Sequence, residues 1–415
     1  MKITLLLHNA YAIGGTVRTT FNLAAALAAQ HEVEIVSMMR HREVPRFTPD
    51  PRVRLVPLVD TRVGSDDMAD PLFSEPARDF PAAEKRHHQY SRLIDVRVAE
   101  FLRTTDAEVL IGTRPGINVY LARFGPRRAL RIAQEHLRHD AHAKRLRAEL
   151  ARHYRGLDAL VTTTEADAAV YRRRMPLPGV RVLAVPNIVP APDQTPSDGD
   201  APLIAAAGRL VRGKRFDLLI EAFSAVAAKH PEWRLRIHGG GAEREALQGL
   251  IDGLGLTGRA ELTGPVSPIE AEFAKASIVA SASDAESFGM TLVEAMRCGV
   301  PVVSTDCPLG PAEIIDSGHD GLLVPTGDGR ALAAGLLELI EDPARRRQMA
   351  TAALDSARRY DPEPIADRYR QLFEQLRATR RSRALRRALG GARLRLGRLV
   401  RGGLRRLKRA GGAAG

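Results

Sequence analysis

Two glutamates eight positions apart, Glu286 and Glu294, flank a glycine in the stretch 281–301, which reads SASDAESFGMTLVEAMRCGVP. An apolar run at 277–280 predicts a short buried strand before this stretch, and the polar residues that follow predict a turn. After Gly289 the apolar residues recur at helical spacing, so we expect a helix there. The first N–H groups of such a helix have no internal partners, and the helix dipole adds partial positive charge. The strand, glycine turn and helix together predict a binding site for phosphate.

The two carboxylates would serve groups attached to the phosphate, because a carboxylate beside the phosphate itself would be repelled. Glu286 precedes the helix, where it would lie beside whatever the phosphates carry. Glu294 lies one turn inside the helix, where it could accept hydrogen bonds from a diol such as a ribose. The stretch therefore indicates a phosphate ligand that carries a sugar.

With Ser-Phe-Gly-Met between the glutamates and Ala-Met-Arg-Cys-Gly-Val-Pro after the second, the stretch resembles the E-x7-E motif of glycosyltransferase family 4. The resemblance implies an α/β protein of the GT-B fold, with two Rossmann-like parallel domains that face a central cleft and a C-terminal helix that crosses back to the N-terminal domain. It also implies a nucleotide-diphosphate-sugar donor and transfer with retention of anomeric configuration. On this resemblance the donor would contact Glu286, Phe288, Gly289, Met290, Thr291 and Glu294.

A cationic segment, GRLVRGKRFD at 208–217, follows the predicted strand 203–207. Cleavage of a sugar–phosphate bond leaves extra negative charge on the β-phosphate, and an enzyme without a metal must stabilise that charge with fixed cations. Arg209 offers a planar fork of donors and Lys214 a point charge, and both suit a diphosphate. The segment also resembles the family, in which matching Arg and Lys residues bind the donor diphosphate. No Asp-x-Asp metal motif accompanies the site, so we expect no essential metal and no other cofactor.

Two glycine turns are further candidates. Gly14 and Gly15 lie between the predicted strand 2–7 and a helix that Thr16 would cap. The resemblance places this loop at the floor of the cleft, near the donor phosphates or the acceptor. Gly240 lies in the turn His238-Gly239-Gly240-Gly241, which the family has near the nucleotide.

His136 is the candidate for contact with the transferred sugar. It follows the predicted strand 130–133, and open α/β sheets place ligand groups at the carboxyl ends of their strands. The family commonly has a histidine there that faces the sugar, whereas the residues alone also allow a merely structural histidine. The cations between 138 and 147, expected in one helix, could meet a phosphate on the acceptor or form an ordinary solvated helix face.

Strands and helices alternate through both halves of the 415-residue chain, a length that suits two domains. We expect a mobile polar loop at 60–81 and helical structure from 83 to 102. A proline-rich segment separates the halves. The expected parts are an acceptor domain at 1–186, a linker at 187–202, a donor domain at 203–360, a cross-over helix at 361–377 and a basic tail at 378–415.

The net charge of +13 equals the charge of the tail, which has thirteen Arg and Lys and no Asp or Glu. The rest of the chain is formally neutral, unlike a nucleic-acid enzyme with a broad basic face. Leucines among the cations at 380–409 fit an interfacial segment on an anionic membrane surface, and the alternative is a disordered basic tail. Two cysteines and the lack of a signal or membrane-spanning pattern predict a cytoplasmic protein, peripheral at most on the inner face of the cell membrane.

These observations predict a retaining transferase that moves a hexose-type sugar from UDP or GDP to a glycan, lipid-linked or polyol acceptor in cell-envelope synthesis. Arg209 and Lys214 would neutralise the leaving diphosphate. Glu286 would orient the sugar, Glu294 would hold the ribose and His136 would face the reacting sugar. The alternatives are a sugar-nucleotide epimerase on a similar fold and a non-catalytic peripheral membrane adaptor.

Overall fold

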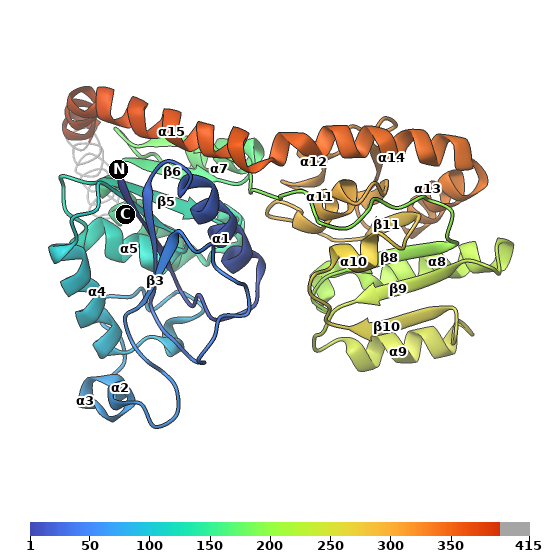
Figure 1. The fold of residues 1–415 in the computed structure, drawn as a ribbon, viewed down its shortest axis with the longest axis horizontal. Helices are drawn as coiled ribbons and strands as arrows, with labels where there is room; N and C mark the ends of the chain where they lie inside the picture. Colours follow the sequence, from blue (N-terminus) through green and yellow to red (C-terminus); the bar gives the residue numbers. More distant parts are fainter. Residues whose placement is uncertain (391–415) are drawn as a thin grey trace, which may run out of the picture. The chain divides into compact units, whose positions relative to one another are not determined.

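The computed structural model describes residues 1–390, which fold into two compact units (Figure 1). Of the described residues, the first unit contains Met1–Thr162, Asp167–Val185 and residues 367–390. The second contains Thr163–Ala166 and Pro186–Ala366. The chain therefore enters the second unit briefly at 163–166, leaves the first unit for the long segment 186–366, and returns to it within its last long helix.

The first unit is built on a parallel sheet of seven strands in the order β3-β2-β1-β4-β5-β6-β7. The strands are β1 Lys2–Leu7, β2 Glu32–Ser37, β3 Val53–Pro57, β4 Val109–Gly112, β5 Leu130–Glu135, β6 Ala159–Thr162 and β7 Arg181–Ala184. The helices are α1 Gly15–Leu27, α2 Asp66–Ala69, α3 Pro71–Ser74, α4 Arg92–Thr104, α5 Pro115–Phe124, α6 Lys144–His153 and α7 Glu165–Arg174. Strands β1, β2, β4, β5 and β6 are buried over nearly all of their residues because a parallel sheet is covered on both faces.

The second unit has a six-stranded parallel sheet in the order β10-β9-β8-β11-β12-β13. The strands are β8 Leu203–Ala207, β9 Arg234–His238, β10 Ala260–Gly264, β11 Ile278–Ser281, β12 Val302–Thr305 and β13 Gly321–Val324. The helices are α8 Phe216–Lys229, α9 Arg244–Gly253, α10 Glu270–Phe273, α11 Met290–Arg297, α12 Pro311–Ile314, α13 Gly329–Glu341 and α14 Pro343–Ala357, and α15 Pro362–Ala378 follows.

Alternate strand residues of the second unit enter two different cores. Ile204 and Ala206 of β8 pack with the core under α8, α9 and α13, whereas Ala205 packs with the core under α10, α11 and α14. The chain builds outward from β8 through β9 and β10, then crosses to β11 on the other side of β8. Open sheets bind ligands at the carboxyl ends of the strands at such a reversal. The reversal thus lies between the strands that precede Arg209 and Glu286, and two parallel α/β units confirm the predicted fold class.

Three local expectations for the first unit were wrong. The segment 60–81 is not a featureless loop: it contains α2 and α3, and Phe80 is buried and stacks on Tyr90 with ring centroids 3.6 Å apart. The helix expected from 83 begins only in α4, where the Ser91 hydroxyl accepts a hydrogen bond from the N–H of Ile94 at 3.4 Å. Helix α1 begins at Gly15 with Gly14 as its N-cap and without a side-chain cap, so Thr16 does not cap it.

The cations between 138 and 147 also do not share one helix. A short 3-10 turn at His139–Ala141 precedes α6, which begins at Lys144. At this break the His139 N–H donates a hydrogen bond to the Asp167 carboxylate at 3.1 Å, which anchors the loop to α7. Tertiary contact therefore overrides the local helical pattern.

The first part of the predicted tail, residues 380–390, is helical and packs on the first unit. Arg383 is buried, and its Nη1 lies 2.7 Å from Oδ1 of Asp158. Arg387 donates to the carbonyl of Leu157 at 2.6 Å. Residues 391–409 of the expected interfacial segment lie outside the described residues. Within 380–390, two of the arginines are therefore structural.

Candidate functional site

Loops at the carboxyl ends of neighbouring strands meet in the second unit. The loop after β8 contacts the turn after β9, since the N–H of Gly208 donates to the His238 carbonyl at 3.0 Å and the N–H of Leu210 to the Gly240 carbonyl at 2.9 Å. The loop after β11 contacts the loop after β8 through the N–H of Asp284, which donates to the Gly213 carbonyl at 3.0 Å. The two predicted site segments, 208–217 and 281–301, are therefore brought together.

Lys214 and Glu286 form an ion pair at this junction. Nζ of Lys214 lies 2.5 Å from Oε1 of Glu286, and the two side chains are 22% and 13% exposed. The hydroxyl of Ser283 donates to the same carboxylate oxygen at 2.7 Å, and Ser283 is itself buried. The carbonyl of Ser283 in turn accepts a hydrogen bond from the Thr305 hydroxyl at 2.7 Å. Glu286 is thus held in one orientation by a cation and by a buried hydroxyl.

Sequence analysis did not identify Ser283 as part of this site. The signal was local, because a serine in a turn commonly bonds to a neighbouring group a few residues along the chain. The spacing of three residues between Ser283 and Glu286 indicates that the two side chains could meet. The apolar pattern of 277–280 does not indicate that the Ser283 hydroxyl would be buried.

The four cations of the loop after β8 differ in availability. Arg209 is exposed and forms no ion pair within residues 1–390. Arg212 is 93% exposed at its side chain and lies 3.9 Å from Glu243. Arg215 has a left-handed backbone at φ 48° and pairs with Asp217 at 3.1 Å and Asp284 at 3.4 Å. Arg215 therefore ties the two loops together, whereas Arg209 is exposed and Lys214 pairs with Glu286.

Helix α11 begins directly beside this pair. Gly289 is its N-cap at φ 108°, and no side chain caps the helix. The N–H of Leu292 donates back to the Gly289 carbonyl at 3.0 Å, so the N–H groups of Met290 and Thr291 are the ones that a ligand could meet. A Cβ at Gly289 would lie 2.9 Å from Leu292 Cδ1 and 3.1 Å from Ile314 Cδ1, so glycine is required for conformation and for space.

The other predicted residues of this stretch are placed differently. Phe288 is buried in the core and meets Tyr360 edge to face with ring centroids 5.5 Å apart, so only its backbone is free to approach a ligand. Glu294 is also buried, at 5% exposure. Met290 and Thr291 are half-buried at the start of α11.

The glycine turn after β9 has two kinds of position. A Cβ at Gly239 would lie 1.8 Å from the Gly208 carbonyl oxygen, and one at Gly241 would lie 2.2 Å from that of Leu210. Gly240 is exposed, and its nearest neighbour to an added Cβ would be Pro265 at 3.8 Å. Gly239 and Gly241 therefore allow the two loops to pack, while Gly240 leaves open space.

In the first unit, His136 follows β5 directly. Burial lowers the pKa of His136 to about 4, against a weaker opposing effect of Glu135, so the ring is neutral at pH 7. Its Nε2 is buried and makes no hydrogen bond within residues 1–390. Gly14 and Gly15 follow β1, and an added Cβ would meet no atom within 4 Å at either position.

A buried polar network supports the loop after β5. Glu135 accepts hydrogen bonds from the Tyr154 hydroxyl and, at 3.2 Å, from the Asn118 amide. His142 Nε2 lies 3.3 Å from the other oxygen of Glu135, and this carboxylate raises the pKa of His142 although burial opposes the charge. These residues were not predicted, because no local spacing links them. The network fixes the segment that begins with His136.

Metal-ligand clusters, membrane-spanning helices and reactive thiols are absent from the described residues. Within 1–390 no group of three or more His, Cys, Asp or Glu side chains is arranged to hold a metal ion. Over the same residues, none of the helices combines the length and apolar character that a bilayer span requires. Both cysteines are buried, and burial raises the pKa of Cys298 to about 12 and that of Cys307 to about 11.

Comparison with known proteins also indicates a glycosyltransferase. Residues 190–355 match the family model described as "Glycosyl transferases group 1". The chain is 35% identical over 386 residues to the exopolysaccharide phosphotransferase SCO2592 of Streptomyces coelicolor, covering 91% of this chain and 41% of that protein. It therefore spans about two fifths of the length of that relative.

Two further matches cover more of the other protein. The lipopolysaccharide core biosynthesis glycosyltransferase LpsD of Rhizobium meliloti is 30% identical over 250 residues, which are 57% of this chain and 71% of LpsD. The structure of a TarM mutant of S. aureus in complex with Fondaparinux, alpha-GlcNAc-glycerol and UDP superposes with a TM-score of 0.72 at 16% identity, covering 90% of this chain and 99% of TarM. At that identity the likeness shows the fold, and it agrees with the predicted GT-B class.

Proposed function

We propose that this chain, which belongs to the group 1 glycosyltransferases, transfers a hexose-type sugar from a nucleotide-diphosphate donor with retention of anomeric configuration. The observation that carries the proposal is the Lys214–Glu286 pair at 2.5 Å beside the uncapped start of α11. Cation, carboxylate and helix N-terminus are the three groups that a sugar joined to a diphosphate requires. They all lie within the segment that matches the family model.

The donor diphosphate would occupy the start of α11, with Arg209 and Lys214 on its oxygens. Glu286 would accept hydrogen bonds from sugar hydroxyls, and Glu294 would accept them from the ribose. The bond between the anomeric carbon and the β-phosphate oxygen breaks, and the nucleoside diphosphate leaves. An acceptor hydroxyl bonds to the anomeric carbon from the same face, and its proton passes to the departing β-phosphate oxygen. Within the first unit, neutral His136 is the candidate for binding a sugar, and the Gly14–Gly15 loop is the candidate for binding donor or acceptor.

Donor binding would also change the pairing of Lys214. In the structure its ammonium group is bound to Glu286. A diphosphate carries more negative charge than one carboxylate, so it would draw Lys214 toward itself. Glu286 would then be released to the sugar while Ser283 keeps its orientation. Two fixed cations and the helix start provide the charge stabilisation, so the proposed reaction needs no essential metal, and turnover should persist in EDTA.

The relatives suggest a donor and an acceptor class. UDP is bound in the TarM structure, and LpsD acts in lipopolysaccharide core synthesis by its name. We therefore favour UDP or GDP as the nucleotide and a glycan or lipid-linked acceptor of the cell envelope, with a polyol as the smaller alternative. We further propose that the protein acts in the cytoplasm, peripherally on the inner face of the membrane through the basic segment 380–409. Within its described part, Leu385 and Leu389 are 61% and 58% exposed between arginines.

The test is thermal stabilisation of the purified chain by UDP-, GDP-, ADP- and TDP-sugars. A ligand that binds only the native state raises the unfolding temperature by mass action. We expect a rise with one nucleotide class, its loss in Arg209→Ala and its retention in Arg212→Ala, a matched loop cation that is 93% exposed. Equal shifts in both variants would contradict the assigned role of Arg209. Donor consumption without any acceptor product would instead favour an epimerase, and no donor binding at all would favour an adaptor.

A further inference from the structure

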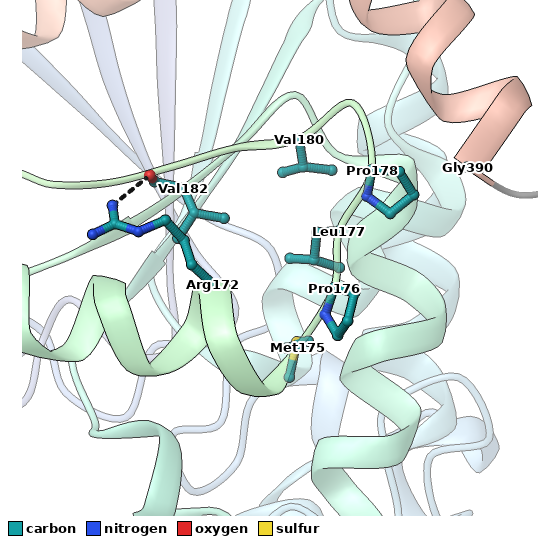
Figure 2. Close-up of a pocket in the computed structure, with 8 residues that line it drawn as sticks. All are labelled: Arg172, Met175, Pro176, Leu177, Pro178, Val180, Val182 and Gly390. Atoms are coloured by element: carbon teal, nitrogen blue, oxygen red, sulfur yellow. Dashed lines mark hydrogen bonds between the residues drawn. The ribbon is translucent and has the colours of Figure 1, made fainter. Parts of the chain in front are cut away.

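An apolar pocket of about 450 Å³ lies in the first unit between the end of α7, the turn that follows it and strand β7 (Figure 2). Its lining includes Met175, Leu177, Pro178, Val180 and Val182. The volume falls within the range of about 300–1,000 Å³ that is usual for small-molecule sites. Neither His136 nor the predicted donor segments, 208–217 and 281–301, contribute to this pocket. The proposed sugar transfer therefore leaves the pocket unexplained.

The pocket wall is fixed by close backbone packing. The N–H of Met175 donates to the Tyr171 carbonyl at 2.8 Å, and the N–H of Val180 donates to the Leu177 carbonyl at 3.0 Å. Gly179 closes this turn at φ 77°, where an added Cβ would lie 2.4 Å from the Arg383 carbonyl oxygen. The turn therefore holds its shape without a ligand.

The helical residues 380–390 close one end of the pocket. Gly390 belongs to the lining, and a Cβ at that position would lie 2.3 Å from Cβ of Pro178. Arg383 and Gly390 thus lie on the face of this segment that packs on the turn. Leu385 and Leu389 are one turn apart and largely exposed. An apolar pocket is therefore accompanied by exposed leucines on the segment that bounds it.

One arginine belongs to the pocket lining, and others lie on the elements that bound it. The Arg172 guanidinium points toward β7 and donates to the Val182 carbonyl at 3.2 Å (Figure 2). Arg172, Arg173 and Arg174 form the last turn of α7, and Arg174 is bound to Asp140 at 2.5 Å. Arg381 and Arg386 are exposed on the segment that carries the leucines. An occupant would therefore need an apolar body and a negative charge at its end.

We propose that this pocket binds an acyl chain of an anionic membrane lipid, with the headgroup at Arg172. The chain's own residues 391–415 are a poorer occupant, because they carry eight Arg and Lys and no Asp or Glu, and like charges at the rim would repel them. Burial of apolar chain and attraction of an anionic headgroup are the two contributions that hold proteins at a membrane surface. The site gives the proposed membrane partner a defined contact, and it does not depend on the sugar-transfer chemistry.

The first experiment is flotation of the full chain with phosphatidylcholine vesicles, with and without phosphatidylglycerol. We expect binding only with phosphatidylglycerol and about tenfold weaker binding of Val180→Asp, since a charge would have to enter the apolar pocket. Val63→Asp is the matched control, because Val63 is 97% exposed and lies outside the pocket lining. Arg172→Gln should also weaken binding, by severalfold, through loss of one cation near the headgroup.

A second measurement locates the contact without any substitution. Vesicles that contain a lipid with a photoreactive group in its acyl chain should cross-link to residues 175–182 of the wild-type chain. Cross-links confined to 391–415, or full binding by Val180→Asp, would overturn the proposal and leave only a basic tail on the membrane. Stabilisation by a nucleotide sugar, measured on the same variants, should not change. Its absence from wild type would refute the proposed transferase site and leave the lipid result standing.

Discussion

Replacement of Glu286 by glutamine should strengthen nucleoside-diphosphate binding while it abolishes most sugar transfer. In the free protein the Glu286 carboxylate holds Lys214 at 2.5 Å. A diphosphate must compete for that ammonium group and must also tolerate the negative charge nearby. A glutamine side chain would keep the size of the glutamate, remove its charge and release Lys214. The same change would weaken the grip on the sugar hydroxyls that the carboxylate is proposed to orient.

The size of the effect follows from Coulomb's law. Two unit charges about 6 Å apart interact by roughly 3 kcal/mol at an effective dielectric constant near 20. The pair is partly exposed, so screening reduces the net change to about 1 kcal/mol, or about fivefold tighter UDP or GDP binding. Lys214→Met has the opposite sign: loss of a hydrogen bond to a charged group costs about 1.5–3 kcal/mol, or roughly 10- to 150-fold. Turnover of the sugar donor should fall about 100-fold in Glu286→Gln through lost orientation.

Calorimetric titration with the nucleoside diphosphate and a turnover assay with the nucleotide sugar measure the two effects separately. Glu221→Gln, the same chemical change at an exposed position of α8, serves as the control and should alter neither. Weaker diphosphate binding in both Glu286→Gln and Lys214→Met would refute the idea that the carboxylate competes with the ligand. Unchanged turnover in Glu286→Gln would remove Glu286 from the reaction.

Three further predictions concern stability. Asp158→Ala should lower the free energy of unfolding by about 3–5 kcal/mol, because buried Arg383 would lose its partner. Urea denaturation measures this free energy, and a loss under about 1 kcal/mol would contradict the buried pair. Gly289→Ala should cost about 1–3 kcal/mol and weaken donor binding, because alanine is strained at φ 108°; a fully stable variant would show that the turn relaxes. The pKa of His136 is about 4 in the fold and about 6.5 when unfolded, so the unfolded state binds the proton first and stability falls as the pH drops from 6.5 to 4. In an acid titration followed by unfolding, His136→Asn should lack up to about 3 kcal/mol of this loss of stability. Identical curves for the variant and the wild type would mean that the ring lies in solvent.

The sheets and the donor segments were predictable because their signals are local. Strands buried on both faces are short apolar runs, and the glycine turns after them mark where ligands bind. Lys214 and Glu286 follow β8 and β11, which are hydrogen-bonded neighbours, so two segments 72 residues apart meet at one sheet edge. The order of parallel strands in this class of fold is enough to place them together.

The contacts that fix those side chains were not predictable from spacing. Asp158 and Arg383 are 225 residues apart, and the cationic pattern of 380–409 indicates solvent or membrane rather than a buried partner. Arg215 is an ordinary loop cation in the sequence, but its left-handed backbone turns it toward Asp284. Helix α4 begins at Arg92 with Ser91 as its N-cap, and Phe80 stacks on Tyr90 directly before that cap, a contact that the apolar pattern does not show.

The two buried thiols make the native chain a ready background for site-specific labelling. Cys298 and Cys307 are the only cysteines in the sequence, and with pKa values of about 12 and about 11 almost none of either is thiolate near neutral pH. The thiolate is the nucleophile that attacks an alkylating reagent, so an exposed cysteine introduced elsewhere would react selectively while both native residues stay in place. A fluorophore at position 63 and another at position 212 would each report on one unit, without any change to the apolar packing around the donor segments.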